Sequence, residues 1–128
     1  MPLQAAAAIH NFQIIHLDLA REPGHPQGSV SDRYTLVLPL KADGRVDQAE
    51  CKGFPDLCTV SRTLENGSFM RGIVRRDADH NWLFDFGEPL EPEIAFGFSK
   101  QKMVPGEYVS VRRDGEDHTY RIISLQPL

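Results

Sequence analysis

The sequence has little of what would point directly to a class of protein, beginning with cysteine. It contains only two cysteines, Cys51 and Cys58. Their spacing fits neither the close pairs of a zinc knuckle nor a redox Cys-x-x-Cys motif. Since the chain shows no secretory signature, we expect both thiols to be reduced rather than joined. A disulfide framework and a cysteine-based zinc site are therefore disfavoured.

Basic residues are also few: the chain has 14 Lys and Arg residues and 18 Asp and Glu residues, which gives a net charge of −4. Broad binding to nucleic acid requires a basic surface, so a nucleic-acid partner is not expected. Arginine nevertheless outnumbers lysine ten to four, and its guanidinium suits bidentate contacts with carboxylate or phosphate. A local anion site stays open, although we favour ordinary Arg-carboxylate pairs on exposed strand faces. A nucleic-acid hypothesis would rest on Arg71, Arg75, Arg76, Arg112, Arg113 and Arg121.

Long apolar runs and familiar catalytic motifs are missing as well. The first residues lack a basic leader, and no run is long enough to cross a bilayer, so we expect a cytoplasmic protein with no membrane partner. There is no Gly-x-Ser-x-Gly elbow, phosphate-binding Gly-rich loop, His-Glu-x-x-His helix or dinucleotide fingerprint. We therefore expect no cofactor, and the common hydrolase and nucleotide-dependent enzymes lose support.

What the chain does have is a motif that occurs twice. Val-Arg-Arg-Asp, a short polar turn and then Asp-His-x-aromatic appear within residues 73–84 and again within residues 110–122, with one residue inserted. Apolar alternation on both sides of each turn predicts two related β-hairpins.

The motif also suggests a register for each hairpin. A loop of Asp77 to Asp79 would place Val74 opposite Trp82, Gly72 opposite Phe84, Met70 opposite Phe86 and Arg71 opposite Asp85. A tip of Asp114 to Asp117 would place Val111 opposite Tyr120 and Val109 opposite Ile122. Equivalent residues of the two copies would then occupy equivalent pairing positions in their hairpins.

The remaining segments predict an all-β domain spanning residues 1–128. Residues 10–40 read as a hairpin with a long Pro- and Gly-rich loop, and residues 57–126 as antiparallel strands. We expect residues 1–9 to be flexible, and one short helix at most, near residues 46–52. About eight mainly antiparallel strands would form a small barrel or a two-layer sandwich, and we favour the barrel.

Two groups of residues are candidates for catalysis or metal binding. His16 and Asp18 project from one strand face beside the loop that carries His25, and such a pair can act as an acid-base couple or as metal ligands. The second group is the paired hairpin tips, which would bring imidazoles and carboxylates together if they converged: Asp77, Asp79, His80, Asp114, Asp117 and His118. For both groups, we favour the interpretation that these are ordinary surface or turn residues with no catalytic or metal-binding role.

Candidate ligand-binding residues come from the same hairpins and from an aromatic set. In the register above, Arg76 lies across from His80 and Arg113 across from His118. The aromatic set could line a cavity or simply fill the core, which we favour: Trp82, Phe84, Phe86, Phe96, Phe98 and Tyr120. The residues singled out for a ligand are Arg21, Arg76, Arg113, Trp82 and Tyr120.

Four stretches look familiar: residues 19–26, residues 34–40, Trp82-Leu83-Phe84-Asp85 and Gly106-Glu107-Tyr108-Val109-Ser110. Together they resemble a loose group of small bacterial all-β proteins that has no established function. The resemblance implies an intracellular bacterial protein and carries over no activity, cofactor or catalytic residue.

The sequence thus favours a non-enzymatic binding or accessory β module for a partner protein or a small anionic or apolar ligand. The exposed strand edges of an open sheet would favour a homo-oligomer. The alternative is a metal-dependent or acid-base enzyme that uses His16, Asp18 and His25, or the hairpin tips.

Overall fold

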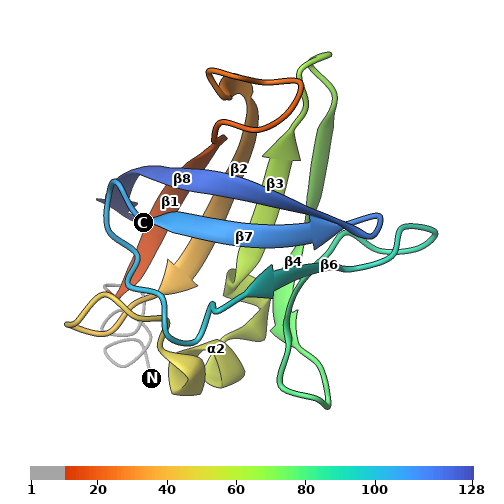
Figure 1. Ribbon diagram of the computed structural model, residues 1–128. Coiled ribbons are helices and arrows are strands. Elements are labelled where there is room, and N and C mark those ends of the chain that lie inside the picture. Colours follow the sequence, from red (N-terminus) through yellow and green to blue (C-terminus); the bar gives the residue numbers. More distant parts are fainter. Residues whose placement is uncertain (1–10) are drawn as a thin grey trace.

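Alternating apolar and polar side chains produce eight antiparallel strands that close into a barrel in the order of the sequence (Figure 1). The structure is a computed structural model, described for residues 11–128. The strands are β1 (Phe12–Leu19), β2 (Ser29–Pro39), β3 (Thr59–Thr63), β4 (Phe69–Arg76), β5 (Trp82–Asp85), β6 (Glu93–Phe96), β7 (Tyr108–Arg113) and β8 (Glu116–Pro127). The expected all-β fold is confirmed.

Closure of the barrel decides between the two architectures that the sequence left open. Strand β1 pairs with β2 on one side and with β8 on the other, so the described strands form a continuous ring rather than two layers. A closed ring leaves no sheet edge free for another chain. The argument for a homo-oligomer from exposed strand edges is therefore wrong.

One short α-helix, α2 (Gln48–Gly53), and a 3-10 turn, η1 (Pro55–Leu57), interrupt the strands of the described chain. The helix lies where the sequence predicts one. Asp47 caps it by accepting a hydrogen bond of 3.2 Å from the Glu50 backbone nitrogen. Within residues 11–128, no helix has the length and apolar character that crossing a membrane requires.

The connections between strands alternate between the two ends of the barrel. We call one end the mouth, which is formed by residues 20–28, 64–68, 86–92 and 114–115. The other end, which we call the α2 end, carries α2, residues 77–81 and residues 97–107 (Figure 1). The two repeated hairpins thus turn at opposite ends, because β4–β5 turns at the α2 end and β7–β8 at the mouth.

Aromatic side chains fill the middle of the barrel. Trp82 packs on Phe98 with ring centroids 5.5 Å apart, Phe84 on Phe98 at 5.9 Å, and Tyr34 on Phe84 at 5.2 Å. Tyr120 is completely buried beside Tyr34. Towards the α2 end the interior is apolar, with Phe12, Leu38, Val46, Cys58 and Met103 buried.

In both hairpins the expected strands pair with each other, but the register is shifted by two residues from the predicted one. Val74 faces Phe84 rather than Trp82, because the loop between β4 and β5 spans residues 77–81. Val109 faces Tyr120, because Asp114 and Gly115 alone form the turn, with φ of 54° and 77°. A shift of two keeps the same side chains on the inner face, which is why the predicted core survives the error.

The shift also changes which charged residues meet on the outer face of β4 and β5. Asp85 is bonded to Arg75 at 2.8 Å, not to Arg71 as the predicted register implied. Gly72 lies against the Asp85 carbonyl group, where a side chain would not fit. This close approach accounts for a glycine in the middle of a strand.

Candidate functional site

Six polar side chains point into the barrel near the mouth. They come from five strands and are Asp32, Tyr34, Arg62, Glu93, Arg113 and Tyr120. Each occupies an inward position of its strand, as Arg62 does two residues after Val60 and Arg113 two residues after Val111. Polar groups in such positions require partners inside the protein. We call this set the mouth cluster.

Arg62 and Asp32 form the first part of the mouth cluster. Arg62 donates from Nε to Asp32 Oδ1 at 3.2 Å and from Nη2 to Oδ2 at 3.0 Å. Tyr120 adds a third bond to the carboxylate by donating its hydroxyl to Oδ1 at 3.0 Å. Both charged residues are 7% exposed, so the pair is a buried, bidentate ion pair.

Arg113 forms the second part. Its Nη1 donates to the Tyr34 hydroxyl at 2.8 Å and to the Tyr120 hydroxyl at 3.2 Å. Tyr34 in turn donates its hydroxyl proton to Glu93, whose Oε1 lies 3.9 Å from Arg113 Nη1. The two tyrosines thus join both ion pairs into one network, in which each hydroxyl donates to a carboxylate and accepts from Arg113.

Burial shifts the acidities in this network. It raises the pKa of Glu93 above its ordinary value of 4.5, although the Tyr34 hydrogen bond and the nearby arginines act in the opposite direction. Burial also raises the pKa of Tyr120 to about 12 and raises the pKa of Tyr34 further above its ordinary value of 10. Both phenols are therefore neutral donors at neutral pH, and burial favours the protonated form of Glu93.

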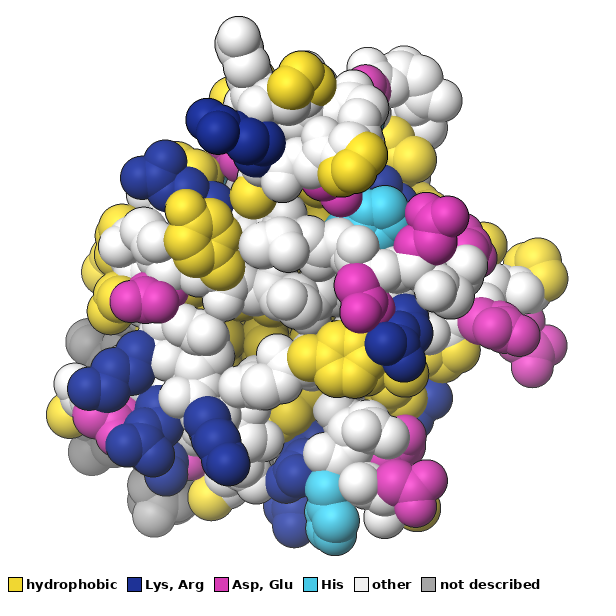
Figure 2. Space-filling model, viewed as in Figure 1, with side chains coloured by type: hydrophobic (Ala, Val, Ile, Leu, Met, Phe, Trp, Pro, Cys, Tyr) yellow, Lys and Arg dark blue, Asp and Glu magenta, His cyan; other side chains and the backbone are white. Residues whose placement is uncertain are grey.

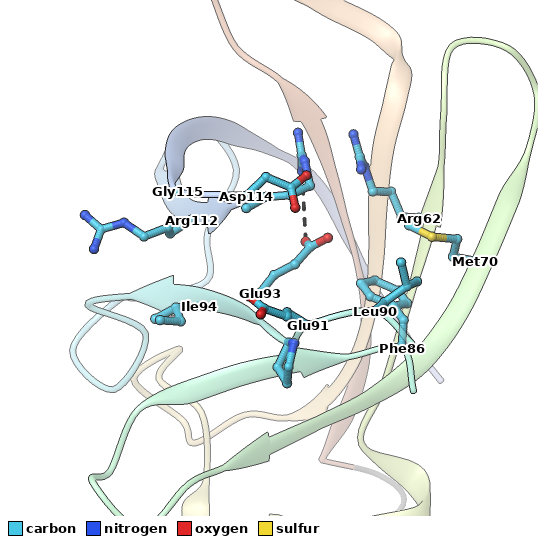
Figure 3. Close-up of a pocket in the computed structure, with 12 residues that line it drawn as sticks. Arg62, Met70, Phe86, Leu90, Glu91, Glu93, Ile94, Arg112, Asp114 and Gly115 are labelled. Atoms are coloured by element: carbon cyan, nitrogen blue, oxygen red, sulfur yellow. Dashed lines mark ion pairs between the residues drawn. The ribbon is translucent and has the colours of Figure 1, made fainter. Parts of the chain in front are cut away.

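A cavity of 270 Å³ opens beside the mouth cluster (Figure 3). Its apolar wall comes from Met70, Phe86, Leu90, Pro92 and Ile94. Its polar side comes from Arg62, Glu91, Glu93, Arg112 and Arg113 together with the turn of Asp114 and Gly115. Figure 3 shows the Glu93 side chain aimed toward the β7–β8 turn, whereas Arg112 points away from the other labelled residues.

The guanidinium of Arg113 is only partly used by the protein. Its hydrogen bonds to residues within 11–128 all start from Nη1, which leaves Nε and Nη2 for another partner. The Arg113 side chain is 15% exposed and lines the cavity. This cavity wall therefore offers charged donors to a molecule that enters the mouth.

The five residues predicted to bind a ligand divide into three places. Arg113 and Tyr120 belong to the mouth cluster. Arg76 and Trp82 lie near the α2 end, where Arg76 covers the Trp82 ring at 5.4 Å and bonds to Gln48. Arg21 is exposed on the outer face, beside β8. The structure thus forms two separate pairs from the five and leaves Arg21 apart from both.

Of the predicted catalytic residues, His16 and Asp18 lie on the same outer face of β1, as predicted, whereas His25 lies elsewhere. Asp18 is bonded to Arg33 at 2.7 Å, and His16 Nδ1 lies 3.1 Å from the Thr35 hydroxyl on the outer face of β1 and β2. His25 instead contacts Glu22 and Glu65 at the mouth. Burial and then Arg33 lower the pKa of His16 below 6.5.

The hairpin tips do not converge either, because they lie at opposite ends of the barrel. Asp77 accepts from the backbone nitrogens of Asp79 and Asn81 and so stabilises its own turn. Asp117 pairs with Arg112, and His118 lies 3.1 Å from Glu22. His80, with φ of 66°, is part of the tip at the α2 end. Within residues 11–128, no three potential ligands are grouped as a metal ion requires.

The arginines of the nucleic-acid hypothesis are also dispersed. Arg113 is inside the barrel, whereas Arg75 and Arg112 are neutralised by Asp85 and Asp117. Arg71 and Arg121 lie on strands β4 and β8, which are not neighbours in the barrel. They do not form one basic surface.

Sequence reasoning missed Asp32, Tyr34, Arg62 and Glu93. A signal was present, because each of these residues falls on the apolar side of an alternating strand: Asp32 and Tyr34 are in phase with Leu36, and Glu93 is in phase with Ala95. A charged residue in phase with buried neighbours indicates a buried polar network. Finding that three strands direct these residues to one end required the closed topology.

Comparison of the chain with protein-family models, with curated protein sequences and with solved structures finds no match in any of the three.

Proposed function

We propose that the protein is a non-enzymatic binding module that holds a small organic anion in the mouth cavity. One observation carries this proposal: Arg113 is fixed by two buried tyrosine hydroxyls, yet presents unused donors to a cavity of 270 Å³. A guanidinium held in this way loses little side-chain freedom when it binds a carboxylate or phosphate.

The charges of the mouth cluster favour an anion. The Asp32 carboxylate accepts both bonds from Arg62 and a third from Tyr120, so it neutralises Arg62. Within residues 11–128, Glu93 is the one salt-bridge partner of Arg113, at 3.9 Å, and the pKa of Glu93 is raised by burial. Within the mouth cluster, a proton on Glu93 leaves two buried cations with one buried anion, and an incoming anion restores the balance. The cavity lining adds the carboxylates of Glu91 and Asp114 and the guanidinium of Arg112.

The shape of the cavity suggests the rest of the ligand. Ligand sites combine an apolar lining with a few polar groups that fix orientation. Here Met70, Phe86 and Leu90 provide apolar surface opposite Arg113. The volume is at the lower end of what small-molecule sites require, which suits an acidic group on a body no larger than one ring.

An acid-base enzyme remains the second candidate, now with Glu93 in place of His16, Asp18 and His25. The observation that favours it is the raised pKa of a carboxyl group beside a cavity. It predicts that the bound molecule is converted and that Glu93→Gln abolishes the conversion. A binding module releases its ligand unchanged.

We also propose that the protein is cytoplasmic. Cys51 and Cys58 are free thiols, as is usual in a reducing compartment. A homo-oligomer stays a prediction, and light scattering in solution tests it.

The experiment is isothermal titration calorimetry with four probes of similar size: benzoate and phenyl phosphate as anions, and benzyl alcohol and benzylamine as neutral and cationic controls. We expect the anions to bind more tightly than the controls. Arg113→Gln should weaken the anions by about 10- to 100-fold, the usual contribution of a charged hydrogen bond.

Leu90 supplies a matched pair of variants, because it is 49% exposed and lines the cavity without belonging to the mouth cluster. Leu90→Lys should tighten benzoate about twofold to threefold and Leu90→Glu should weaken it by a similar factor, as expected for a charge separated from the ligand by water. The proposal is contradicted if all four probes bind equally. It is also contradicted if the affinity for benzoate is the same in the wild type, Arg113→Gln, Leu90→Lys and Leu90→Glu.

A further inference from the structure

Three arginines on the outer face of the barrel have an acidic partner. Arg33 pairs with Asp18, Arg75 with an aspartate of β5, and Arg112 with an aspartate of β8. Arg21 and Arg121 differ, because neither forms a salt bridge with any residue of the described part of the chain. Like Arg71 on β4, these two arginines therefore have guanidinium groups that are available on the outer face.

Both of these arginines line the same groove, which has a volume of 580 Å³. It runs between the end of β1, the loop of residues 20–28 and the outer face of β8. Three apolar side chains of the groove are unusually open: Val30 is 76% exposed, Tyr108 52% and Ile123 39%. We call this surface the outer groove.

Figure 2 shows basic and hydrophobic side chains side by side over the left ends of β7 and β8. Asp18 is the one carboxylate among the described residues that line the outer groove, and Arg33 holds it with two hydrogen bonds, of 2.7 and 3.3 Å. The groove therefore has a positive balance on a chain whose net charge is −4.

We propose that the outer groove docks an acidic segment of a partner protein, one in which Asp or Glu residues are interspersed with apolar side chains. Carboxylates would pair with Arg21 and Arg121, while apolar side chains cover Val30, Tyr108 and Ile123. Arginine and tyrosine are the residues that most often anchor protein interfaces. The site is separate from the mouth cavity and does not depend on the function proposed for it.

The charge of the outer groove and the closed barrel both favour an acidic protein segment as its partner. Two arginines on an acidic chain are too few for the phosphate backbone of a nucleic acid, which demands an extended basic surface. The closed ring leaves no strand edge for β-augmentation, so the partner must be recognised by its side chains. The open groove, unlike the mouth cavity, suits a chain rather than a small molecule.

The experiment is selection from a library of random displayed peptides against the intact protein, followed by fluorescence polarisation with synthetic copies of the enriched peptides. We expect enrichment of peptides rich in Asp and Glu that also carry apolar residues. Arg21→Glu and Arg121→Glu should each weaken binding about tenfold or more, and added salt should do the same.

Arg71→Glu is the matched control, because Arg71 is also exposed and outside the ion pairs of the described residues, but it lies on β4, away from the outer groove. Binding by Arg71→Glu should equal that of the wild type. The proposal is overturned if no acidic peptides are enriched or if Arg21→Glu and Arg121→Glu bind them as well as Arg71→Glu does. It is also overturned if the wild type self-associates through this face and Arg121→Glu is monomeric, because the occupant is then a second copy.

Discussion

Arg62 and Asp32 lie 30 positions apart in the sequence and share two hydrogen bonds inside the barrel. Neither side chain has more than 11% of its surface exposed. A charge in this position is stable only while its partner is present, since water cannot replace the lost bonds. Each member of the pair therefore depends on the other for its place in the folded barrel.

Removing one charge of this pair should be strongly destabilising. We expect Asp32→Asn to lower the free energy of unfolding by about 3 to 5 kcal/mol, because the variant leaves Arg62 buried without its counter-ion. Urea unfolding followed by tryptophan fluorescence measures the change. Asp117→Asn is the control, because it breaks the exposed pair with Arg112 and should cost about 1 kcal/mol or less. Similar losses in both variants would mean that the Arg62–Asp32 pair is not sealed from water.

Glu93 should make stability depend on pH in a defined direction. Its pKa is raised in the folded protein, so the folded state holds a proton that the unfolded state releases near pH 4.5. The contribution of this proton to the free energy of unfolding is fully present below pH 4.5. It is lost as the pH rises through the pKa of Glu93 in the folded protein. Relative to the wild type, Glu93→Gln should therefore gain stability as the pH rises from 4.5.

The measurement is a series of urea unfolding curves for the wild type and Glu93→Gln between acidic and mildly alkaline pH. The difference between the two proteins isolates Glu93 from the surface aspartates Asp77, Asp85 and Asp117, whose lowered pKa values act in the opposite direction in both. Two parallel curves would show that Glu93 titrates as an ordinary carboxyl group.

Gly72 should not tolerate a side chain. A methyl group there would overlap the Asp85 carbonyl oxygen and come within 2.9 Å of the Phe86 Cα atom, so the two strands would have to move apart. We expect Gly72→Ala to destabilise the protein by about 1 to 3 kcal/mol, as overpacking usually does. Gly53→Ala provides the contrast: its position at the end of α2 is open, and alanine there should be neutral or stabilising by up to about 1 kcal/mol. Thermal melting of both variants compares them directly, and an undisturbed Gly72→Ala variant would contradict the close approach.

His16 should titrate below its ordinary pKa of 6.5, because burial and the charge of Arg33 oppose protonation. Arg33→Gln should raise the midpoint and Asp18→Asn should lower it, since Asp18 favours the protonated ring. Proton NMR of the imidazole resonances follows both. A midpoint of titration above 6.5 in the wild type would instead favour the acid-base couple that the sequence offered as a weaker candidate.

The strands and their inner faces were predictable from local patterns, whereas the closure of the barrel was not. Alternation placed Trp82, Phe84 and Tyr120 on inner faces, and a register error of two residues left them there. The loop lengths were not predictable, because Asp114 and Gly115 form a complete turn with positive φ at both positions, whereas the Asp-rich sequence around them also suits a longer tip.

The candidate site was only partly predictable. Arg113 and Tyr120 stood out because they belong to the repeated motif, but their partners Tyr34 and Glu93 lie 79 and 20 positions away from Arg113. Contacts of this kind depend on ring closure, which no local pattern encodes. The same closure separates the two hairpin tips, so the symmetry that the repeat suggests does not bring their histidines together.

The most direct test of the central claim, that the mouth cavity is an anion site built on Arg113, is a two-dimensional ¹H–¹⁵N NMR titration with benzoate. We predict that amide shifts concentrate at Glu93, Arg113, Asp114 and Gly115, and that they disappear in Arg113→Gln while Leu90→Lys retains them. Shifts that cluster at the α2 end, or no shifts at millimolar benzoate, would contradict the claim.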